Sequence, residues 1–323
     1  MEVILAIDGG GSRTRCLAIN REAKVLGAGE SGASNHLLVD KKIVKTSLDE
    51  AIKTALPQAN LKRSNVVCVS AGLAGVDFDG SGADEMKELF RELGFTNTVI
   101  VGDMVTAHAG ALGGQAGVLA LAGTGSSILG IGADSTHVKV GGWGPIYGDE
   151  GSAYGIAQNC LRAAARSYDG HGDKTALLNA ITSALGLKNF SETVRRVYVE
   201  KMESREIAEL CRPAYEVAEK GDEEAIKIFL KAGDELAESV AAALQRLDLT
   251  ETKAKVSYQG SVLESCVLVR EKFAESLKKD FPKVEIVPPR FKPVVGAFLI
   301  GCKAAGWTLD KDNFLELEKI EMR

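Results

Sequence analysis

The sequence has few of the features that mark metal sites or covalent cross-links. Its 323 residues include six cysteines, which lie far apart and form no CxxC pair. The four histidines show no HxxxH spacing, and most of the cysteines stand within apolar segments. We therefore expect buried free thiols rather than a cysteine–histidine metal site or a set of disulfides.

Long apolar runs and an excess of basic charge are also absent. No apolar run approaches the roughly 20 residues that a membrane-spanning helix needs. The N-terminal segment has no basic region and reaches an acid at Asp8, so it predicts a strand rather than a signal peptide. The net charge of −5 argues against non-specific binding to nucleic acid. We expect a soluble, cytoplasmic protein with small-molecule ligands, bound neither to a membrane nor to nucleic acid.

Glycine is abundant, with 35 residues concentrated before position 156. A chain of this length has room for two domains. The first half reads as alternating strands and helices, with strands at 3–8, 15–20, 65–70 and 97–101 and helices at 41–56 and 82–93. The second half is mainly helical, and apolar residues at helical spacing predict one long helix over 222–247, capped by Asp222.

A short internal repeat connects the two halves. The segment LAIDGGGS at 5–12 aligns with LALAGTGS at 119–126, with five of eight positions identical. Both segments read as strand, glycine-rich turn and strand. The repeat predicts two related lobes.

The two glycine-rich turns differ from the common nucleotide motifs. No GxxxxGK[ST] string occurs, and both turns lead from strand to strand, which excludes the usual dinucleotide fingerprint. One such turn alone is typical of a hairpin, but two turns followed by hydroxyl residues favour a pair of phosphate-binding turns. Asp8 in the first turn has Ala122 as its counterpart, so we expect Mg²⁺ on the Asp8 side only. The hydroxyl residues are Ser12, Thr14, Thr124, Ser126 and Ser127.

Asp103 and the segment 141–152 can each be interpreted in two ways, as a structural feature or as part of a functional site. Asp103 follows a predicted buried strand and precedes a helix, which is typical of a plain helix N-cap but also suits a general base. The segment 141–152, GGWGPIYGDEGS, places Trp143 among glycines and two acids at a helix start. It predicts either a capped helix with a buried tryptophan or a sugar site with an aromatic wall and carboxylates.

Together these strings resemble a known family. The chain is similar to the N-acetylglucosamine kinases and to the wider ATPase group that includes the dehydratase activators, within the actin–hexokinase superfamily. The matching strings span nearly the whole chain: IDGGGSRT at 7–14, SNH at 34–36, GDMVTAHAG at 102–110, AGTGSS at 122–127, GGWG…GDEGSAY at 141–154 and GSVLES at 260–265.

The resemblance implies an α/β fold of two actin-like, ribonuclease H-like lobes with an ATP and sugar cleft between them. It implies an N-terminal lobe of residues 1–115, joined again by 307–323, and a C-terminal lobe of residues 116–306. Family members often form homodimers and close their lobes around the sugar. The resemblance therefore implies a homodimer whose ligands are ATP, Mg²⁺ and a hexosamine.

The resemblance also implies a role for individual residues. Asp103 would be the catalytic base, and Asp8 would hold Mg²⁺ through water, although the position of Asp8 varies among the amino-sugar kinases. The sugar contacts would be Asn35, His36, Gly142, Trp143, Asp149 and Glu150. The ATP contacts would be Gly10, Gly11, Ser12, Arg13, Thr14, Thr124, Gly125, Ser126, Ala208, Gly260 and Ser261.

The function implied is ATP-dependent phosphorylation of N-acetylglucosamine to its 6-phosphate, with glucosamine or glucose as the alternative acceptor. Another alternative is an ATPase that activates a 2-hydroxyacyl-CoA dehydratase through an iron–sulfur cluster. Such activators place cysteines near the second phosphate turn, whereas the first cysteine after Gly125 is Cys160. A sugar-sensing repressor is a third alternative, but the zinc motif common in that group is absent.

Overall fold

The computed structural model describes residues 1–77 and 79–320 and divides the chain into two compact units. The first unit contains residues 1–117, 133–137 and the chain from Pro288 onward. The second unit contains residues 118–132 and 138–287. Within the described residues no helix combines the length and apolar character needed to span a bilayer.

The first unit is built on a five-stranded sheet in the order β3-β2-β1-β4-β5. The pairings of β1 with β2 and of β2 with β3 are antiparallel, whereas those of β1 with β4 and of β4 with β5 are parallel. The strands are β1 (Val3–Gly9), β2 (Thr14–Asn20), β3 (Val25–Ser31), β4 (Val66–Leu73) and β5 (Thr98–Gly102).

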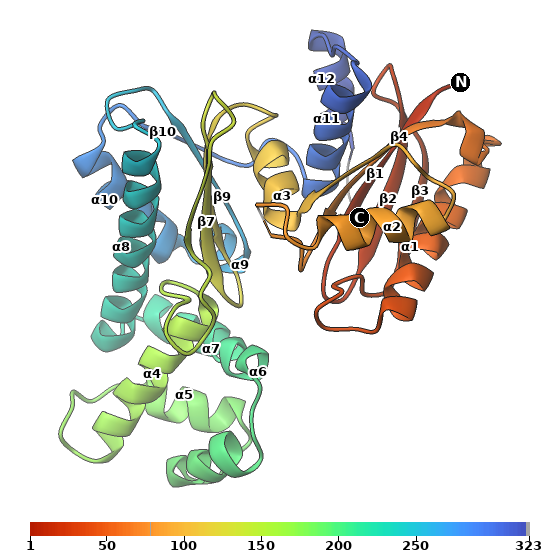
Figure 1. The fold of residues 1–323 in the computed structure, drawn as a ribbon. Coiled ribbons are helices and arrows are strands. Elements are labelled where there is room, and N and C mark those ends of the chain that lie inside the picture. Colours follow the sequence, from red (N-terminus) through yellow and green to blue (C-terminus); the bar gives the residue numbers. More distant parts are fainter. Residues whose placement is uncertain (78, 321–323) are drawn as a thin grey trace. The chain divides into compact units, whose positions relative to one another are not determined.

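Helices cover both faces of this sheet (Figure 1). Strand β1 is apolar without alternation because its two faces meet different cores: Leu5 and Ile7 join the side chains of α1 (Lys41–Ala55) and α2 (Ala83–Glu92). Ile4 and Ala6 point to the opposite core, which contains α11 (Pro293–Ala305). Short 3₁₀ helices, η1 (Leu56–Ala59) and η2 (Arg63–Asn65), connect α1 to β4.

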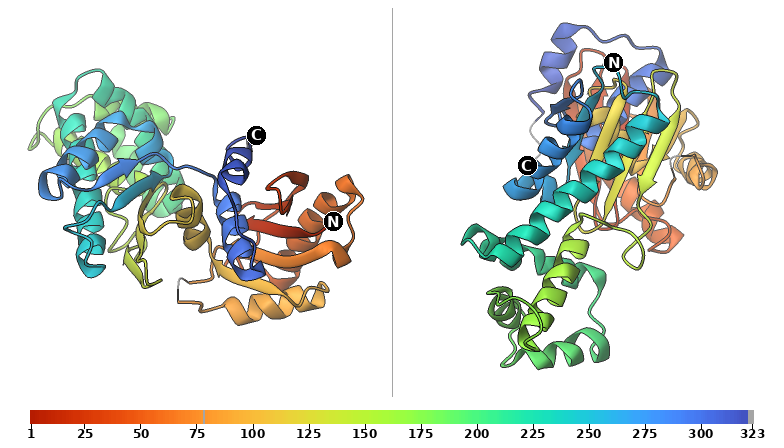
Figure 2. Two further views of the ribbon diagram at one scale, coloured as in Figure 1. Left: turned by 90° about the horizontal axis from the view of Figure 1, so that it is seen from above. Right: turned by 90° about the vertical axis from the view of Figure 1, so that its left-hand side faces the viewer.

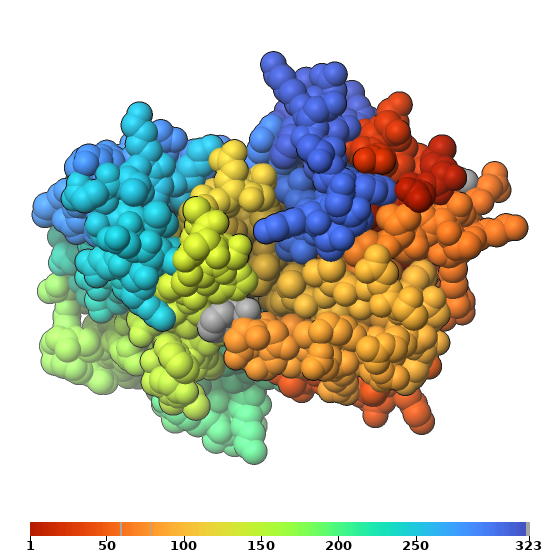
Figure 3. Space-filling view, turned by 45° about the horizontal axis from the view of Figure 1, so that its top comes forward, coloured from red at the N-terminus to blue at the C-terminus, as the bar shows by residue number. Residues whose placement is uncertain are grey.

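Helix α3 (Asp103–Ala111) packs closely on α11. A Cβ at Gly296 would collide with the Thr106 carbonyl, so glycine is what allows the two backbones to approach. The C-terminal helix α12 (Lys311–Leu317) completes the core on this face of the sheet through Leu317. Figure 3 shows this C-terminal segment, in dark blue, at the surface beside the red N-terminal strands.

The family resemblance implies that the chain returns to the first lobe at residue 307. In the structure the second unit already ends at Val287, and the chain from Pro288 onward belongs to the first unit. The physical reason is α11, whose buried residues pack against β1 and β4. Its small and apolar residues alone do not indicate which sheet it covers.

The second unit repeats the topology of the first. Its five-stranded sheet has the order β10-β9-β6-β7-β8. Strands β6 to β10 correspond to β1 to β5, and with this correspondence the second sheet, read from β8 to β10, has the same order as the first sheet read from β3 to β5. Strands β6 and β9 and strands β9 and β10 pair in parallel, like their counterparts. The predicted duplication is therefore present in the fold. The strands are β6 (Gly117–Ala122), β7 (Ser126–Ile131), β8 (His137–Gly141), β9 (Lys255–Gln259) and β10 (Glu285–Val287).

Helices of the second unit form one large core with this sheet. The predicted long helix is α8 (Glu223–Arg246), and the Asp222 side chain caps it by accepting a hydrogen bond from the Ala225 amide. Figure 2 shows α8, in cyan, lying across the strands of the second sheet. The other helices are α4 (Ala153–Tyr168), α5 (Leu177–Ala184), η3 (Phe190–Glu192), η4 (Arg195–Val199), α6 (Ser204–Glu209), α7 (Cys211–Glu219), α9 (Ser261–Ser265) and α10 (Val267–Asp280).

All six cysteines are free and buried, as the sequence predicts. They lie among apolar side chains of the three cores, for example Cys16 beside the α1 residues and Cys302 on α11. Within residues 1–77 and 79–320, no three His, Cys, Asp or Glu side chains form a group that could hold a metal ion.

Candidate functional site

The candidate residues of the first unit lie at one edge of its sheet. The parallel register aligns Gly9 of β1 with Leu73 of β4, and Leu73 with Gly102 of β5. Because Asp103 follows β5 directly, it is placed at the same edge as the first glycine turn. The carboxyl ends of strands are where ligands bind in open α/β sheets.

Two carboxylates meet at this edge. Burial, and next the nearby negative charge of Asp103, raise the pKa of Asp8 to about 6, against the smaller opposing effects of Arg15 and Arg13. Side chains alternate between the two faces of a strand, so Asp8 lies on the same face of β1 as Ala6. This face packs against α11. A carboxyl group with this pKa gains or loses its charge at a pH slightly below neutral. A small change in pH then alters its capacity to bind a metal ion or to transfer a proton.

Asp103 is not the N-cap residue that its position favours. Gly102 occupies the N-cap, and Asp103 is the first residue of α3. The Asp103 carboxylate accepts a hydrogen bond from the Met104 amide over 2.8 Å. The positive end of the helix dipole stabilises the ionised form of a carboxylate at this position.

The first glycine turn is joined to the SNH segment. The Ser34 amide donates to the Gly10 carbonyl over 3.0 Å, and the Thr14 hydroxyl lies 2.8 Å from the Ser34 hydroxyl and 2.7 Å from the Gly32 carbonyl. Thr14 is fully buried, so its side chain supports the turn from inside. Ser12 is exposed. Two strings that are distant in sequence thus form one structure.

Not every amide of the first turn points outward. The Gly10 amide donates to the Arg13 carbonyl over 2.8 Å, which closes the turn on itself. Gly11 is exposed, and the exposed Arg13 side chain forms an ion pair with Glu30 at 3.2 Å.

Asn35 and His36 lie against a second pair of glycines. A Cβ at Gly75 would come within 2.7 Å of Asn35 Oδ1 and within 2.9 Å of His36 Nδ1, and one at Gly82 would come within 3.1 Å of His36 Nε2. The Asn35 carboxamide accepts a hydrogen bond from the Leu37 amide over 3.0 Å. His36 Nδ1 is buried and has no hydrogen-bond partner among the described residues. An orphaned polar atom of this kind is typical of a site that receives a ligand group or water.

Asp149 supports the second glycine turn, residues 122–126, through a hydrogen bond. The Ser126 amide donates to Asp149 Oδ1 over 3.1 Å, and a Cβ at Gly125 would come within 2.8 Å of the same oxygen. The Ser126 hydroxyl donates to the Glu150 carbonyl over 2.7 Å. Ser126 is therefore occupied internally, whereas Thr124 is exposed.

Asp149 is buried, with a left-handed backbone at φ 62°. Its carboxylate supports the second glycine turn, a role that the sequence motifs do not reveal. The helix α4 begins later than the acids, and Ser152 caps it by accepting from the Gly155 amide. Glu150 is exposed.

The loop before these acids carries an exposed aromatic pair. Trp143 is 65% exposed and stacks on Tyr147 with ring centroids 6.5 Å apart. Of the two interpretations of this segment, the one with a buried tryptophan is therefore excluded, because the glycines around Trp143 supply no side chains to cover the ring. Gly142 has φ 72°, and a Cβ there would come within 2.8 Å of the Ser127 hydroxyl.

A cavity of about 930 Å³ lies within the second unit. Its walls include Thr124, Ala208 and Ser261, three predicted ATP contacts from three distant segments. The register of β6 with β9, in which Leu121 faces Gln259, brings Gly260 beside the turn, where a Cβ would collide with the Ala122 carbonyl. The volume suits a nucleotide-sized ligand.

Most residues of this cavity wall are not among the predicted ATP contacts. Besides Ala153 at the start of α4 and Val262 in α9, the additional residues come from α6 and α7 and from the end of α9 to the start of α10. Several stand at spacings of three and four along α6 and α7, a pattern that marks one face of a helix and could have revealed a lining. They are Arg205, Glu209, Cys211, Arg212, Tyr215, Glu216, Glu219, Ser265 and Cys266.

The matching family model extends over residues 5–301 and describes the BadF/BadG/BcrA/BcrD ATPase family. The chain belongs to this family. It is 31% identical over 303 residues to the N-acetylmuramic acid/N-acetylglucosamine kinase of Clostridium acetobutylicum, covering 93% of this chain and 98% of that protein. It is 28% identical over 310 residues to the N-acetyl-D-glucosamine kinase of Dictyostelium discoideum, covering 93% and 97% of the two proteins.

Solved structures agree with this membership at the level of the fold. A Chromobacterium violaceum protein, described as a candidate N-acetylglucosamine kinase, superposes with a TM-score of 0.72 at 23% identity over 93% of this chain and 99% of that one. A glucokinase of the ROK family from Streptomyces griseus gives a TM-score of 0.57 at 14% identity, with 93% and 99% covered. The predicted actin-like α/β fold is confirmed, and the names of the relatives agree with the predicted enzyme class, an ATP-dependent sugar kinase.

Proposed function

We propose that this member of the BadF/BadG/BcrA/BcrD ATPase family transfers the γ-phosphoryl group of ATP to the 6-hydroxyl of N-acetylglucosamine. The main support is the cavity of the second unit, which unites Thr124, Ala208 and Ser261 at a phosphate turn. The acceptor follows from the two curated relatives, both named as N-acetylglucosamine kinases and matched along almost their whole length.

In this proposal Asp103 is the general base. Its carboxylate accepts the proton of the sugar hydroxyl while the oxygen attacks the γ-phosphorus and ADP leaves. The hydrogen bond from the Met104 amide orients the Asp103 carboxylate, and the N-terminus of a helix is a place that favours negative charge. Base catalysis of this kind typically contributes about 10²–10⁴-fold, and positioning of the phosphates supplies the rest.

We propose that the phosphates contact Gly11, Ser12 and Arg13 in the first unit and Thr124 and Gly125 in the second. Gly10, Thr14 and Ser126 then act mainly by shaping the turns, since their amide or hydroxyl groups are used inside the protein. The adenosine is assigned to the wall formed by Ala208, Gly260 and Ser261.

Asp8 is proposed to hold Mg²⁺ through water. One carboxylate beside a phosphate turn fits this ion, which usually keeps several waters and takes its remaining ligands from substrate phosphates. Mg²⁺ at this place would neutralise charge that develops on the transferring phosphates. Asp8 itself must be ionised to hold the ion, and its raised pKa makes that step dependent on pH.

The sugar contacts proposed are Asn35 and His36 in the first unit and Gly142, Trp143 and Glu150 in the second. The orphaned Nδ1 of His36 and the exposed ring of Trp143 support this assignment. Asp149 is proposed to affect the sugar site indirectly, by supporting the second glycine turn, because its carboxylate is buried against Ser126. A homodimer remains a prediction from the family resemblance.

N-Acetylmuramic acid is a second candidate acceptor, because the Clostridium acetobutylicum relative is named for both amino sugars. It differs from N-acetylglucosamine by a lactyl ether that carries a carboxylate. Glucosamine and glucose remain alternatives on the same chemistry, and an ATPase that activates a dehydratase remains an alternative without any sugar acceptor.

The deciding experiment is a coupled assay of ADP release with N-acetylglucosamine, N-acetylmuramic acid, glucosamine, N-acetylmannosamine, glucose and no sugar. We expect strong release with N-acetylglucosamine and almost none without sugar, and a product that carries phosphate on O6 by NMR. Strong release with a different sugar alone would replace the acceptor. Equal release in every reaction would contradict the kinase and support the activator.

A further inference from the structure

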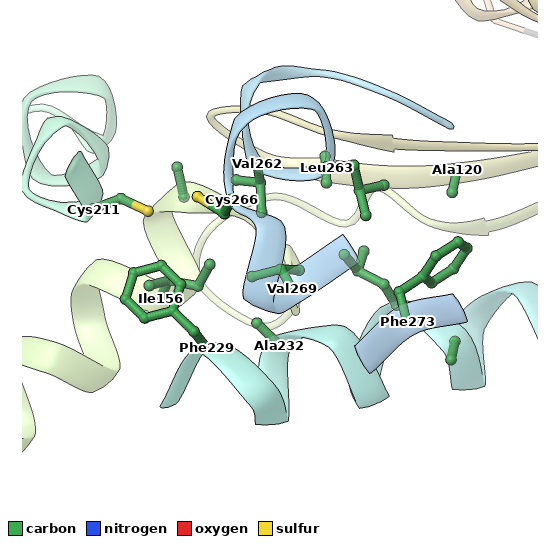
Figure 4. Close-up of a cluster of buried hydrophobic side chains, with 14 of the residues drawn as sticks. Ala120, Ile156, Cys211, Phe229, Ala232, Val262, Leu263, Cys266, Val269 and Phe273 are labelled. Atoms are coloured by element: carbon green, nitrogen blue, oxygen red, sulfur yellow. The ribbon is translucent and has the colours of Figure 1, made fainter. Parts of the chain in front are cut away.

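Two cysteines lie together in the wall of the nucleotide-sized cavity. Cys211 and Cys266 both line it, and they are only 5% and 7% exposed. Each thiol influences the pKa of the other, as expected for two sulfur atoms that lie close together. Figure 4 shows the two sulfur atoms pointing towards each other from two different segments of the second unit. Neither residue belongs to a motif on which the proposed function depends.

The surrounding helices hold the pair in place. Cys211 is the first residue of α7, and Cys266 is the N-cap residue of α10. Tyr215, one turn after Cys211, accepts a hydrogen bond from the Val267 amide over 2.9 Å. The Tyr215 ring also packs edge-on against Phe229 of α8, with centroids 5.1 Å apart. The start of α7 and the start of α10 are therefore tied together beside the two thiols.

The two thiols differ in acidity. The hydrogen bond from Cys211 lowers the pKa of Cys266, with a smaller contribution from Arg270, against burial and Glu219. The same hydrogen bond, together with burial, raises the pKa of Cys211. Cys266 is thus the thiol that attacks an oxidant, and Cys211 is the resolving thiol that attacks the resulting mixed disulfide.

We propose that Cys211 and Cys266 form a reversible disulfide, with a small-molecule disulfide as the oxidant, and that this bond blocks nucleotide binding. The blocking effect rests on the proposed function, because it requires the cavity to be the nucleotide site. The formation of the bond itself does not.

The exchange proceeds in two steps. The Cys266 thiolate attacks one sulfur of the oxidant, which forms a mixed disulfide and releases one small thiolate. Cys211 then loses its proton and attacks the Cys266 sulfur, which forms the protein disulfide and releases the second small thiolate. Two protein thiols are oxidised and one disulfide is reduced to two thiols, so electrons and atoms balance.

The bond would change the shape of the cavity. Two neighbouring thiols must approach to about 2.05 Å between sulfurs to form a disulfide. That movement draws the start of α7 towards the start of α10. Ala208, three residues before Cys211, and Ser265, next to Cys266, line the same cavity and would move with them. An adenosine moiety would then lose the space between these segments.

The test uses dithiobis(nitrobenzoate), a disulfide whose thiolate product is coloured. We expect the wild-type protein to release two equivalents rapidly, to retain no added mass, and to yield a peptide that links Cys211 to Cys266. Cys211→Ala should release one equivalent and keep the thionitrobenzoate on Cys266, while Cys266→Ala should lose the rapid phase. Cys160→Ala, which removes another buried thiol of the same unit, should react like the wild type. A stable adduct on the wild-type protein, or no linked peptide, overturns the proposal.

Nucleotide binding supplies the second measurement. We expect calorimetry to show that the oxidised protein binds ADP at least tenfold more weakly than the reduced one and that dithiothreitol restores affinity. Unchanged affinity after complete cross-linking overturns the blocking effect. Failure of the reduced protein to bind ADP would contradict the proposed function and the blocking effect together, whereas the peptide map would still decide whether the disulfide forms.

Discussion

Asp8 and Asp103 lie close enough that the charge of Asp103 adds to the effect of burial and raises the pKa of Asp8 to about 6. The two carboxylates come from the end of β1 and the start of α3, at one edge of the first sheet. Two neighbouring carboxylates with different environments can divide the work of metal binding and proton transfer. The first two predictions separate these roles.

Asp103→Asn should retain binding of ATP and sugar and lose most turnover. The asparagine amide has the same shape as the carboxylate, and its oxygen can still accept a hydrogen bond from Met104. It cannot accept the proton of the sugar hydroxyl. We expect kcat to fall about 10²–10⁴-fold, with dissociation constants changed little. Coupled ADP release gives kcat, and calorimetry gives the affinities. A kcat near that of the wild type would remove Asp103 from the role of base.

The activity should decline in acid because of Asp8. Its folded-state pKa is raised to about 6, so the carboxylate that we propose as the Mg²⁺ ligand exists mainly above that pH and is lost as the pH falls through it. We expect kcat/KM for MgATP to fall by up to tenfold per pH unit on the acid side of about pH 6. The measurement is a pH profile of kcat/KM at saturating sugar.

Asp8→Asn is the matched control for that profile. It should have low activity throughout and lack the acid limb, because no carboxyl group titrates at position 8. In the wild type, bound MgATP should shift the limb in kcat to lower pH, since the cation favours the ionised carboxylate. An identical acid limb in Asp8→Asn and the wild type would assign the titration to another group.

Asp149 should act on ATP more than on sugar. The structure joins its carboxylate to the Ser126 amide at 3.1 Å, inside the second phosphate turn. Asp149→Ala removes a charged hydrogen-bond acceptor, which typically costs about 1.5–3 kcal/mol. We expect a rise of roughly tenfold or more in KM for ATP, by the usual conversion of such energies, and a smaller change in KM for sugar.

Glu150→Ala serves as the comparison for Asp149. The Glu150 side chain is exposed, and its contact with the Ser126 hydroxyl uses the backbone carbonyl, which the substitution preserves. Its thermal midpoint and KM for ATP should stay near the wild-type values. The support role of Asp149 would be refuted by a selective rise in KM for sugar in Asp149→Ala.

Gly260→Ala should destabilise the second unit and weaken ATP binding. Gly260 has φ 98°, and an added Cβ would collide with the Ala122 carbonyl at the phosphate turn. A left-handed backbone of this kind costs a residue with a side chain about 1–3 kcal/mol. We expect a lower thermal midpoint and a higher KM for ATP, measured by scanning calorimetry and by the coupled assay.

Gly123→Ala provides the control within the same turn. Apart from its two chain neighbours, no heavy atom of the described residues lies within 4 Å of a Cβ added at Gly123, and its φ lies outside the left-handed range. Its thermal midpoint should therefore remain close to that of the wild type. Equal thermal losses in both variants would show that the turn tolerates no side chain at all, and the argument from Gly260 packing would fail.

Local patterns in the sequence determined the elements and their duplication. The apolar run of β1, the glycine turns and the helical spacing of α8 are properties of neighbouring residues, so they are visible without tertiary structure. The match between 5–12 and 119–126 predicted two related units, and both sheets have the same strand order. The strings around Asp8, Asp103 and Thr124 likewise pointed to the correct family before any coordinates.

Only the tertiary structure decided which side chains meet. The register of β6 with β9 places Gly260 on the turn at Ala122. The hydrogen bond between Tyr215 of α7 and the Val267 amide at the start of α10 ties together the segments that carry Cys211 and Cys266. Asp149 proved to be a buried support and Trp143 an exposed ring, although both stand in one short string. Sequence periodicity shows which face of an element is apolar, but strand register and helix packing depend on partners far along the chain.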